Sequence, residues 1–143
     1  CRAVVDGVEL QIGGRPLVTM VGAARWTGEE DPTSGITFSR DGARTARLFP
    51  TDPSATTVAL FDAEGVAMLR ASLAGDTASV MDRSGAVVRT AQRTSAGVAI
   101  GDQTLTGTDD LLLAAILSAS ELLPEVRALA ACHRLLPPQK VTN

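Results

Sequence analysis

Apolar and polar residues alternate in short runs over residues 1–107, and this alternation predicts β-strands joined by tight turns. Residues 3–12 predict a first strand, interrupted at Asp6-Gly7. Gly13-Gly14 predicts a turn or bulge. Leu17–Val21 predicts a second strand, since four of its five positions are apolar. After this strand the pattern becomes polar, and we expect Trp26 to lie near the start of a loop.

From residue 35 onward the pattern repeats at intervals of 20 or 21 residues. Each repeat places an acid between two apolar runs, which predicts a β-hairpin with Asp opening the turn and Gly closing it. Asp accepts hydrogen bonds from backbone amides two residues on, and Gly tolerates a positive φ. The turn residues are therefore explained by structure, and we assign them no catalytic role. The turn acids are Asp41, Asp62, Asp82 and Asp102, and the clearest closing glycines are Gly65 and Gly85.

The last apolar stretch, residues 108–136, has a different period and predicts helix. Thr108 and Asp109 are good N-cap types. Pro124 cannot donate a helical hydrogen bond, so we expect two helices or one bent helix, over residues 109–122 and 124–136. Residues 137–143 form a short polar tail that begins with two prolines.

The first of these helices is apolar almost all round, which predicts burial on most sides. Leu112, Ala115, Ile116 and Ala119 share one face. Leu111, Leu113 and Leu117 add apolar surface elsewhere, and they meet either the protein's own sheet or a neighbouring subunit. The predicted fold is therefore α+β: one domain over residues 1–143, with an antiparallel β meander or barrel over residues 1–107 packed on C-terminal hydrophobic helices.

The composition narrows the classes of function. Hydrophobic residues make up 45% and charged residues 20% of the chain, which is typical of a globular domain. The net charge is −3 and there is no basic block, so nucleic-acid binding is not expected. The longest uninterrupted apolar run, residues 111–117, is far below the roughly 20 residues of a membrane-spanning helix.

Candidate catalytic and metal-binding residues are few. The single His, His133, adjoins Cys132, but neighbouring helical residues point about 100° apart, which makes a poor catalytic dyad. Glu29, Glu30 and Asp31 offer oxygen atoms to a hard cation, yet their spacing matches no EF-hand loop, and a solvated acidic loop is the simpler interpretation. We expect no catalytic, metal or cofactor-binding residues and no enzyme activity.

The residue that bears most on localisation is Cys1. A chain that begins at Cys1 resembles a bacterial lipoprotein, in which the sulfur of this cysteine carries a lipid. The resemblance covers this residue alone and implies lipidation of Cys1. Because Arg2 follows, it implies attachment to the outer membrane facing the periplasm. The alternative is a Cys1–Cys132 disulfide, which excludes the lipid because both use the same sulfur.

The repeated Asp-x-x-Gly hairpins followed by a very apolar helix resemble the tubby C-terminal, LURP-one and scramblase-like fold over about residues 35–136. In that family a β barrel encloses its terminal helix. Some members bind phosphoinositides through a basic pocket, but the Arg residues here form no such pattern, and a solvated strand face is expected instead.

Together these features predict a non-catalytic, lipid-anchored accessory or structural subunit of a bacterial cell-envelope complex. It would meet the membrane through the Cys1 lipid and other envelope proteins through a sheet face or edge. The alternative is a small β-barrel protein that binds a lipid or another apolar ligand.

Overall fold

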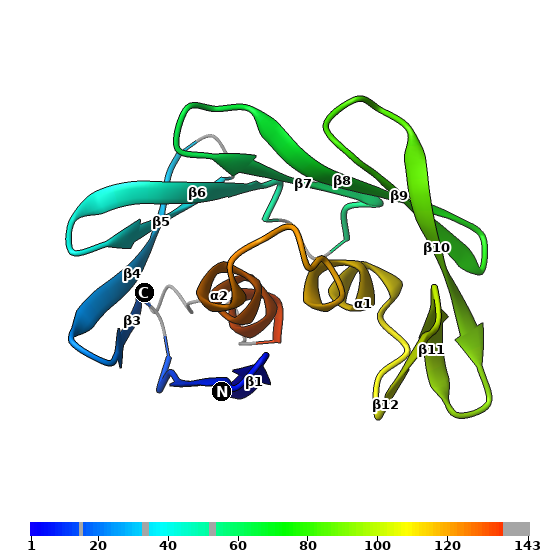
Figure 1. The fold of residues 1–143 in the computed structure, drawn as a ribbon, viewed down its shortest axis with the longest axis horizontal. Helices are drawn as coiled ribbons and strands as arrows, with labels where there is room; N and C mark the ends of the chain where they lie inside the picture. The colour runs from blue at the N-terminus through cyan, green and yellow to red at the C-terminus, as the bar shows by residue number, and fades with distance from the viewer. Residues whose placement is uncertain (15, 33–34, 52–53, 136–143) are drawn as a thin grey trace, which may run out of the picture.

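The computed structural model describes residues 1–14, 16–32, 35–51 and 54–135 of the chain. Twelve β-strands in these residues precede two helices (Figure 1). The strands are β1 (Arg2–Val5), β2 (Val8–Gln11), β3 (Leu17–Val21), β4 (Ala24–Glu30), β5 (Ile36–Arg40), β6 (Ala43–Phe49), β7 (Thr57–Asp62), β8 (Ala67–Ala74), β9 (Thr77–Met81), β10 (Val87–Thr94), β11 (Gly97–Ile100) and β12 (Gln103–Thr106). The helices are α1 (Leu111–Leu117) and α2 (Pro124–Leu135).

Strands β3 to β12 form one antiparallel meander, in which each strand pairs with its neighbour in sequence. The sheet curves around the two helices but stays open, with β3 and β12 as its edges (Figure 1). The α+β meander is therefore confirmed and the closed barrel is wrong. Strands β1 and β2 form a separate hairpin on the side of α2 away from β6 and β7.

The helices fill the inner face of the sheet, by which we mean the face turned toward them. α1 contacts β8 to β11, and α2 contacts β1, β2 and β3. Leu111 and Leu113 are 1% and 3% exposed, so of the two alternatives left open by the sequence they pack in the protein's own core. Leu117 is half-buried against the same core. None of the described helices is long and apolar enough to cross a membrane.

The first helix, α1, is shorter than the predicted residues 109–122. The carboxylate of Asp110, not Asp109, caps α1 by accepting from the amides of Leu112 and Leu113. The chain leaves the helix at Ser118, whose hydroxyl donates to the carbonyl of Ala115. Pro124 begins α2, a position where its missing N–H costs nothing, so the expected break at this residue is confirmed. Residue 136 and the tail lie outside the described residues.

The hairpin turns at Asp62 and Asp82 have the predicted chemistry. The carboxylate of Asp62 accepts from the amides of Glu64 and Val66, and that of Asp82 accepts from the amides of Ser84 and Ala86. Gly65 and Gly85 close these turns with φ of 84° and 88°.

Two segments differ from the sequence prediction. Residues 3–12 form a hairpin and not one strand, because Asp6 and Gly7 both take positive φ and reverse the chain. The expected polar loop at Trp26 is strand β4, which pairs with β3 and β5. Pairing on both sides overrides the weak strand preference of its polar residues, while Trp26 is buried on the inner face.

Candidate functional site

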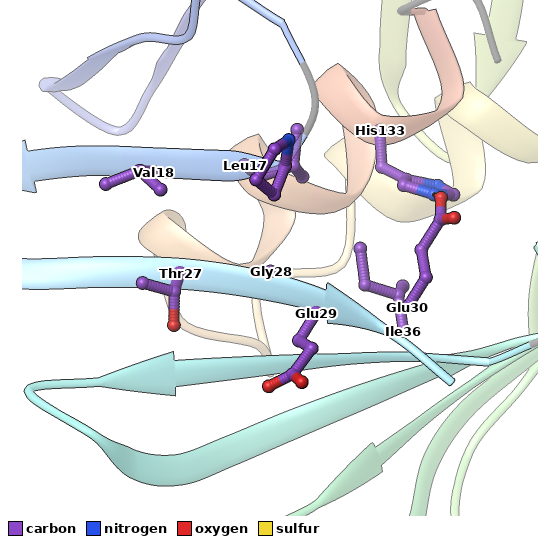
Figure 2. Close-up of a pocket in the computed structure, with 9 residues that line it drawn as sticks. Leu17, Val18, Thr27, Gly28, Glu29, Glu30, Ile36 and His133 are labelled. Atoms are coloured by element: carbon purple, nitrogen blue, oxygen red, sulfur yellow. Dashed lines mark hydrogen bonds and ion pairs between the residues drawn. The ribbon is translucent and has the colours of Figure 1, made fainter. Parts of the chain in front are cut away.

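A pocket lies where β3, β4 and β5 meet the last turn of α2 (Figure 2). Its volume is about 510 Å³. Apolar and polar side chains both line it, as is typical of small-molecule sites. The lining residues are Pro16, Leu17, Val18, Thr27, Gly28, Glu29, Glu30, Ile36 and His133.

The polar centre of this pocket is the contact between Glu30 and His133. Nε2 of His133 lies 2.9 Å from Oε1 of Glu30 (Figure 2). The imidazole is 3% exposed and the carboxylate 46% exposed, so the ring is held inside while the acid reaches solvent. Strand alternation places Glu30 on the inner face with Trp26 and Gly28, which turns it toward α2. Such a pair can hold a proton or bind a polar group of a ligand.

The three consecutive acids do not form one cluster. Glu29 points to the outer face of the sheet, away from His133 (Figure 2). Asp31 forms an ion pair with Arg47, whose Nε and Nη2 both lie 3.2 Å from Oδ2 of Asp31. In the described part of the chain, no group of three or more His, Cys, Asp or Glu residues has the geometry to hold a metal ion.

Cys132 adjoins His133 in the sequence, but the structure gives these two residues different roles. Cys132 is bonded to Cys1 in a disulfide with a Cα–Cα distance of 5.7 Å. The sulfur of Cys132 is fully buried and, while the disulfide is formed, is not a thiolate. It therefore does not serve as a nucleophile beside His133. In this structure the sulfur of Cys1 is likewise taken up by the disulfide.

A second contact fixes α2 against the β1–β2 hairpin. The side chain of Arg127 is 5% exposed, and its Nη2 donates to Oδ2 of Asp6 at 2.5 Å. Its other donors reach the carbonyls of Leu117 and Leu122, each at 3.1 Å. A buried guanidinium needs such partners. Sequence reasoning did not single out this residue.

The outer face of the sheet also holds two side chains that sequence reasoning did not single out. The chain has one Trp and three Phe. Trp26 and Phe38 are buried, whereas Phe49 is 38% exposed and Phe61 is half-buried on the outer face. The sequence does contain a signal for this placement, because Phe49 follows Leu48 and Phe61 follows Leu60. These two leucines face inward and pair with one another. Strand alternation then places both rings outward.

Comparisons with protein-family models, with curated proteins and with solved structures found no match.

Proposed function

We propose that the protein is a non-catalytic interaction subunit of a bacterial cell-envelope assembly. The observation that carries this proposal is the placement of Phe49 and Phe61 on the outer face of the sheet. Most of the apolar surface of both helices is already covered by the protein's own strands, with Leu135 at the end of α2 left exposed. Aromatic side chains left on an outer face are typical of the anchors that dominate protein interfaces.

The disulfide supports the proposed location in the cell envelope. Disulfides persist in oxidising surroundings such as the periplasm and the cell surface, and they are rare in reducing ones. Lipid attachment at Cys1 is a separate proposal and applies to a state in which Cys132 is a free thiol. The intact mass of the protein purified from its native envelope distinguishes the states. An added mass of acyl chains supports the anchor, whereas the bare mass less the hydrogens of two thiols excludes it.

Photo-crosslinking tests the interaction proposal. A photoreactive residue in place of the exposed Thr57, which lies beside the two aromatic rings, should yield a discrete crosslinked protein in the native envelope. The matched control replaces Thr104, an exposed residue of the edge strand β12. Absence of a specific adduct at Thr57, with the protein folded and exported, would contradict the proposal.

The pocket at Glu30 and His133 supports a second candidate, the binding of a small and partly apolar ligand. A pocket of about 510 Å³ has the size of a small-molecule site. Native mass spectrometry of the protein from its own envelope should then detect a retained small molecule, and His133→Gln should lose it. Protein that carries no such molecule, or carries it unchanged in the variant, contradicts this candidate.

A further inference from the structure

A groove on the outer face of strands β6 to β9, called here the outer-face groove, has a volume of about 420 Å³. It is bordered by Phe49 from β6, Phe61 from β7 and Met81 from β9. The hydroxyl-bearing Thr57 and Ser72 lie at its margin. Polar and apolar side chains that line one surface together are typical of a protein interface.

The strand register sets the order of side chains across the groove. Phe49 pairs with Ala59, Ala59 with Arg70, and Arg70 with Met81. Directly paired side chains on one face of a sheet are neighbours. A single guanidinium therefore interrupts an apolar row that crosses four strands.

The two arginines near the groove differ in their partners. Arg47 lies over the ring of Phe49, with its guanidinium carbon 5.3 Å from the ring centroid, and its charge is balanced by Asp31. Arg70 is exposed and makes no ion pair with any other residue that the structure describes. The positive charge of Arg70, exposed beside the apolar side chains of the groove, is thus accessible to an anionic group of a partner.

A carboxylate is the group that best matches this position. The planar guanidinium donates two parallel hydrogen bonds that fit the two oxygen atoms of a carboxylate. The neighbouring Phe49 and Met81 offer apolar contact to whatever carries the acid. The groove is open to solvent, so only a partner broad enough to cover its rim excludes water from it. A protein surface has that breadth, whereas a single acyl chain does not.

We propose that the outer-face groove binds a segment of a protein partner in which an apolar side chain adjoins an aspartate or glutamate. The acid meets Arg70 and the apolar side chain lies between Phe49, Phe61 and Met81. This inference rests on the proposed interaction function and adds the chemistry of the partner.

A capped dipeptide, N-acetyl-Leu-Asp-amide, serves as the probe, with N-acetyl-Leu-Asn-amide as its neutral isostere. Each is titrated to millimolar concentration into the isotope-labelled, disulfide-bonded chain, and amide chemical shifts are recorded. The Asp peptide should perturb amides of β6 to β9 and bind about threefold more tightly than the Asn peptide, as expected for one exposed ion pair. Arg70→Gln should abolish that preference. Arg25→Gln, the same loss of charge on the outer face of β4, should keep it.

Three results would overturn the inference: no shifts in β6 to β9, equal affinity for the two peptides, or an Asp preference that survives Arg70→Gln. Dodecanoate binding to the groove more tightly than the Asp peptide would assign the groove to an acyl chain instead. If Thr57 crosslinks a partner while the peptides fail, the proposed function stands and only the partner chemistry falls. If both fail, both proposals fall.

Discussion

At the scale of single residues, the buried guanidinium of Arg127 joins three separate segments of the chain. It holds the carbonyls of Leu117 and Leu122 and the carboxylate of Asp6 from a buried position. Arg127→Met keeps the length of the side chain but leaves both carbonyls without this donor, so the free energy of unfolding should fall by about 3 kcal/mol. Urea denaturation measures this loss.

The matched control is Arg83→Gln in the β9–β10 turn, where the side chain is exposed. An exposed substitution of this kind should change stability by less than about 0.5 kcal/mol. If the urea midpoint of Arg127→Met equals that of the wild type, the hydrogen bonds of Arg127 stabilise the fold by little more than the cost of burying its guanidinium.

A second residue-scale prediction concerns the turn acid Asp82. The hydroxyl of Ser84 and the amides of Ser84 and Ala86 donate to its carboxylate and hold the pKa of Asp82 below its usual value. A lowered pKa in the folded state gives stability that is present above the usual value of about 3.9 and is lost as pH falls through the folded value. Ser84→Ala removes the largest cause, so the pKa should rise toward the usual value. Carboxyl NMR titration measures it, and an unchanged midpoint would contradict the assigned cause.

At the scale of elements, strand β11 depends on Gly97. This residue has a φ of 145° and pairs with both Thr94 and Thr106. A Cβ placed there would overlap the carbonyl oxygen of Leu105 in β12. Gly97→Ala should therefore lower stability by about 2 kcal/mol and speed hydrogen exchange in β12.

Gly13→Ala is the matched control, because its Cβ would meet no atom within 4 Å and its φ is not positive. Equal exchange rates of the β12 amides in the two variants would contradict the clash at Gly97.

Elements with strong local signals were predictable from the sequence. Leu17–Val21 has the predicted bounds, and the Asp62 and Asp82 turns have the predicted hydrogen bonds. The local pattern predicts a loop at strand β4 because the polar residues there become strand only by pairing with β3 and β5. The early end of α1 at Ser118 is likewise not marked in the local pattern, since apolar residues continue beyond the helix.

The candidate sites were also only partly predictable from the sequence. Glu30 and His133 are 103 residues apart in sequence, so their contact follows from the packing of α2 on the sheet and not from a motif. The contact of Asp6 with Arg127 spans 121 residues and could not be predicted from a motif either. The outward rings of Phe49 and Phe61, by contrast, follow from strand alternation alone.

At the scale of the whole molecule, the two ends of the described chain are tied together. The disulfide joins Cys1 to Cys132 across a sequence separation of 131 residues. It fixes the β1–β2 hairpin to α2, and the ion pair of Asp6 with Arg127 fixes the same two elements at the hairpin turn. Among the described residues the hairpin shares no hydrogen-bonded ladder with the ten-stranded sheet. The two ties, the hydrogen bond from the hydroxyl of Thr19 to the carbonyl of Gln11, and apolar packing therefore hold it in place.

Loss of the disulfide should therefore lower the free energy of unfolding by about 2–5 kcal/mol, because a long closed loop restricts the unfolded chain most. Cys1→Ser tests this without opening a cavity around the fully buried Cys132. A reductant should lower the stability of the wild type to that of Cys1→Ser and should not affect the variant itself.

In the reduced protein the Asp6–Arg127 contact still holds the β1–β2 hairpin, so the amides of the hairpin should stay protected from hydrogen exchange. Protection should be lost only when Cys1→Ser and Arg127→Met are combined, with a joint destabilisation that departs from the sum of the two. Exchange of the hairpin amides in Cys1→Ser alone, with the ten-stranded sheet still protected, would contradict the role given to Arg127.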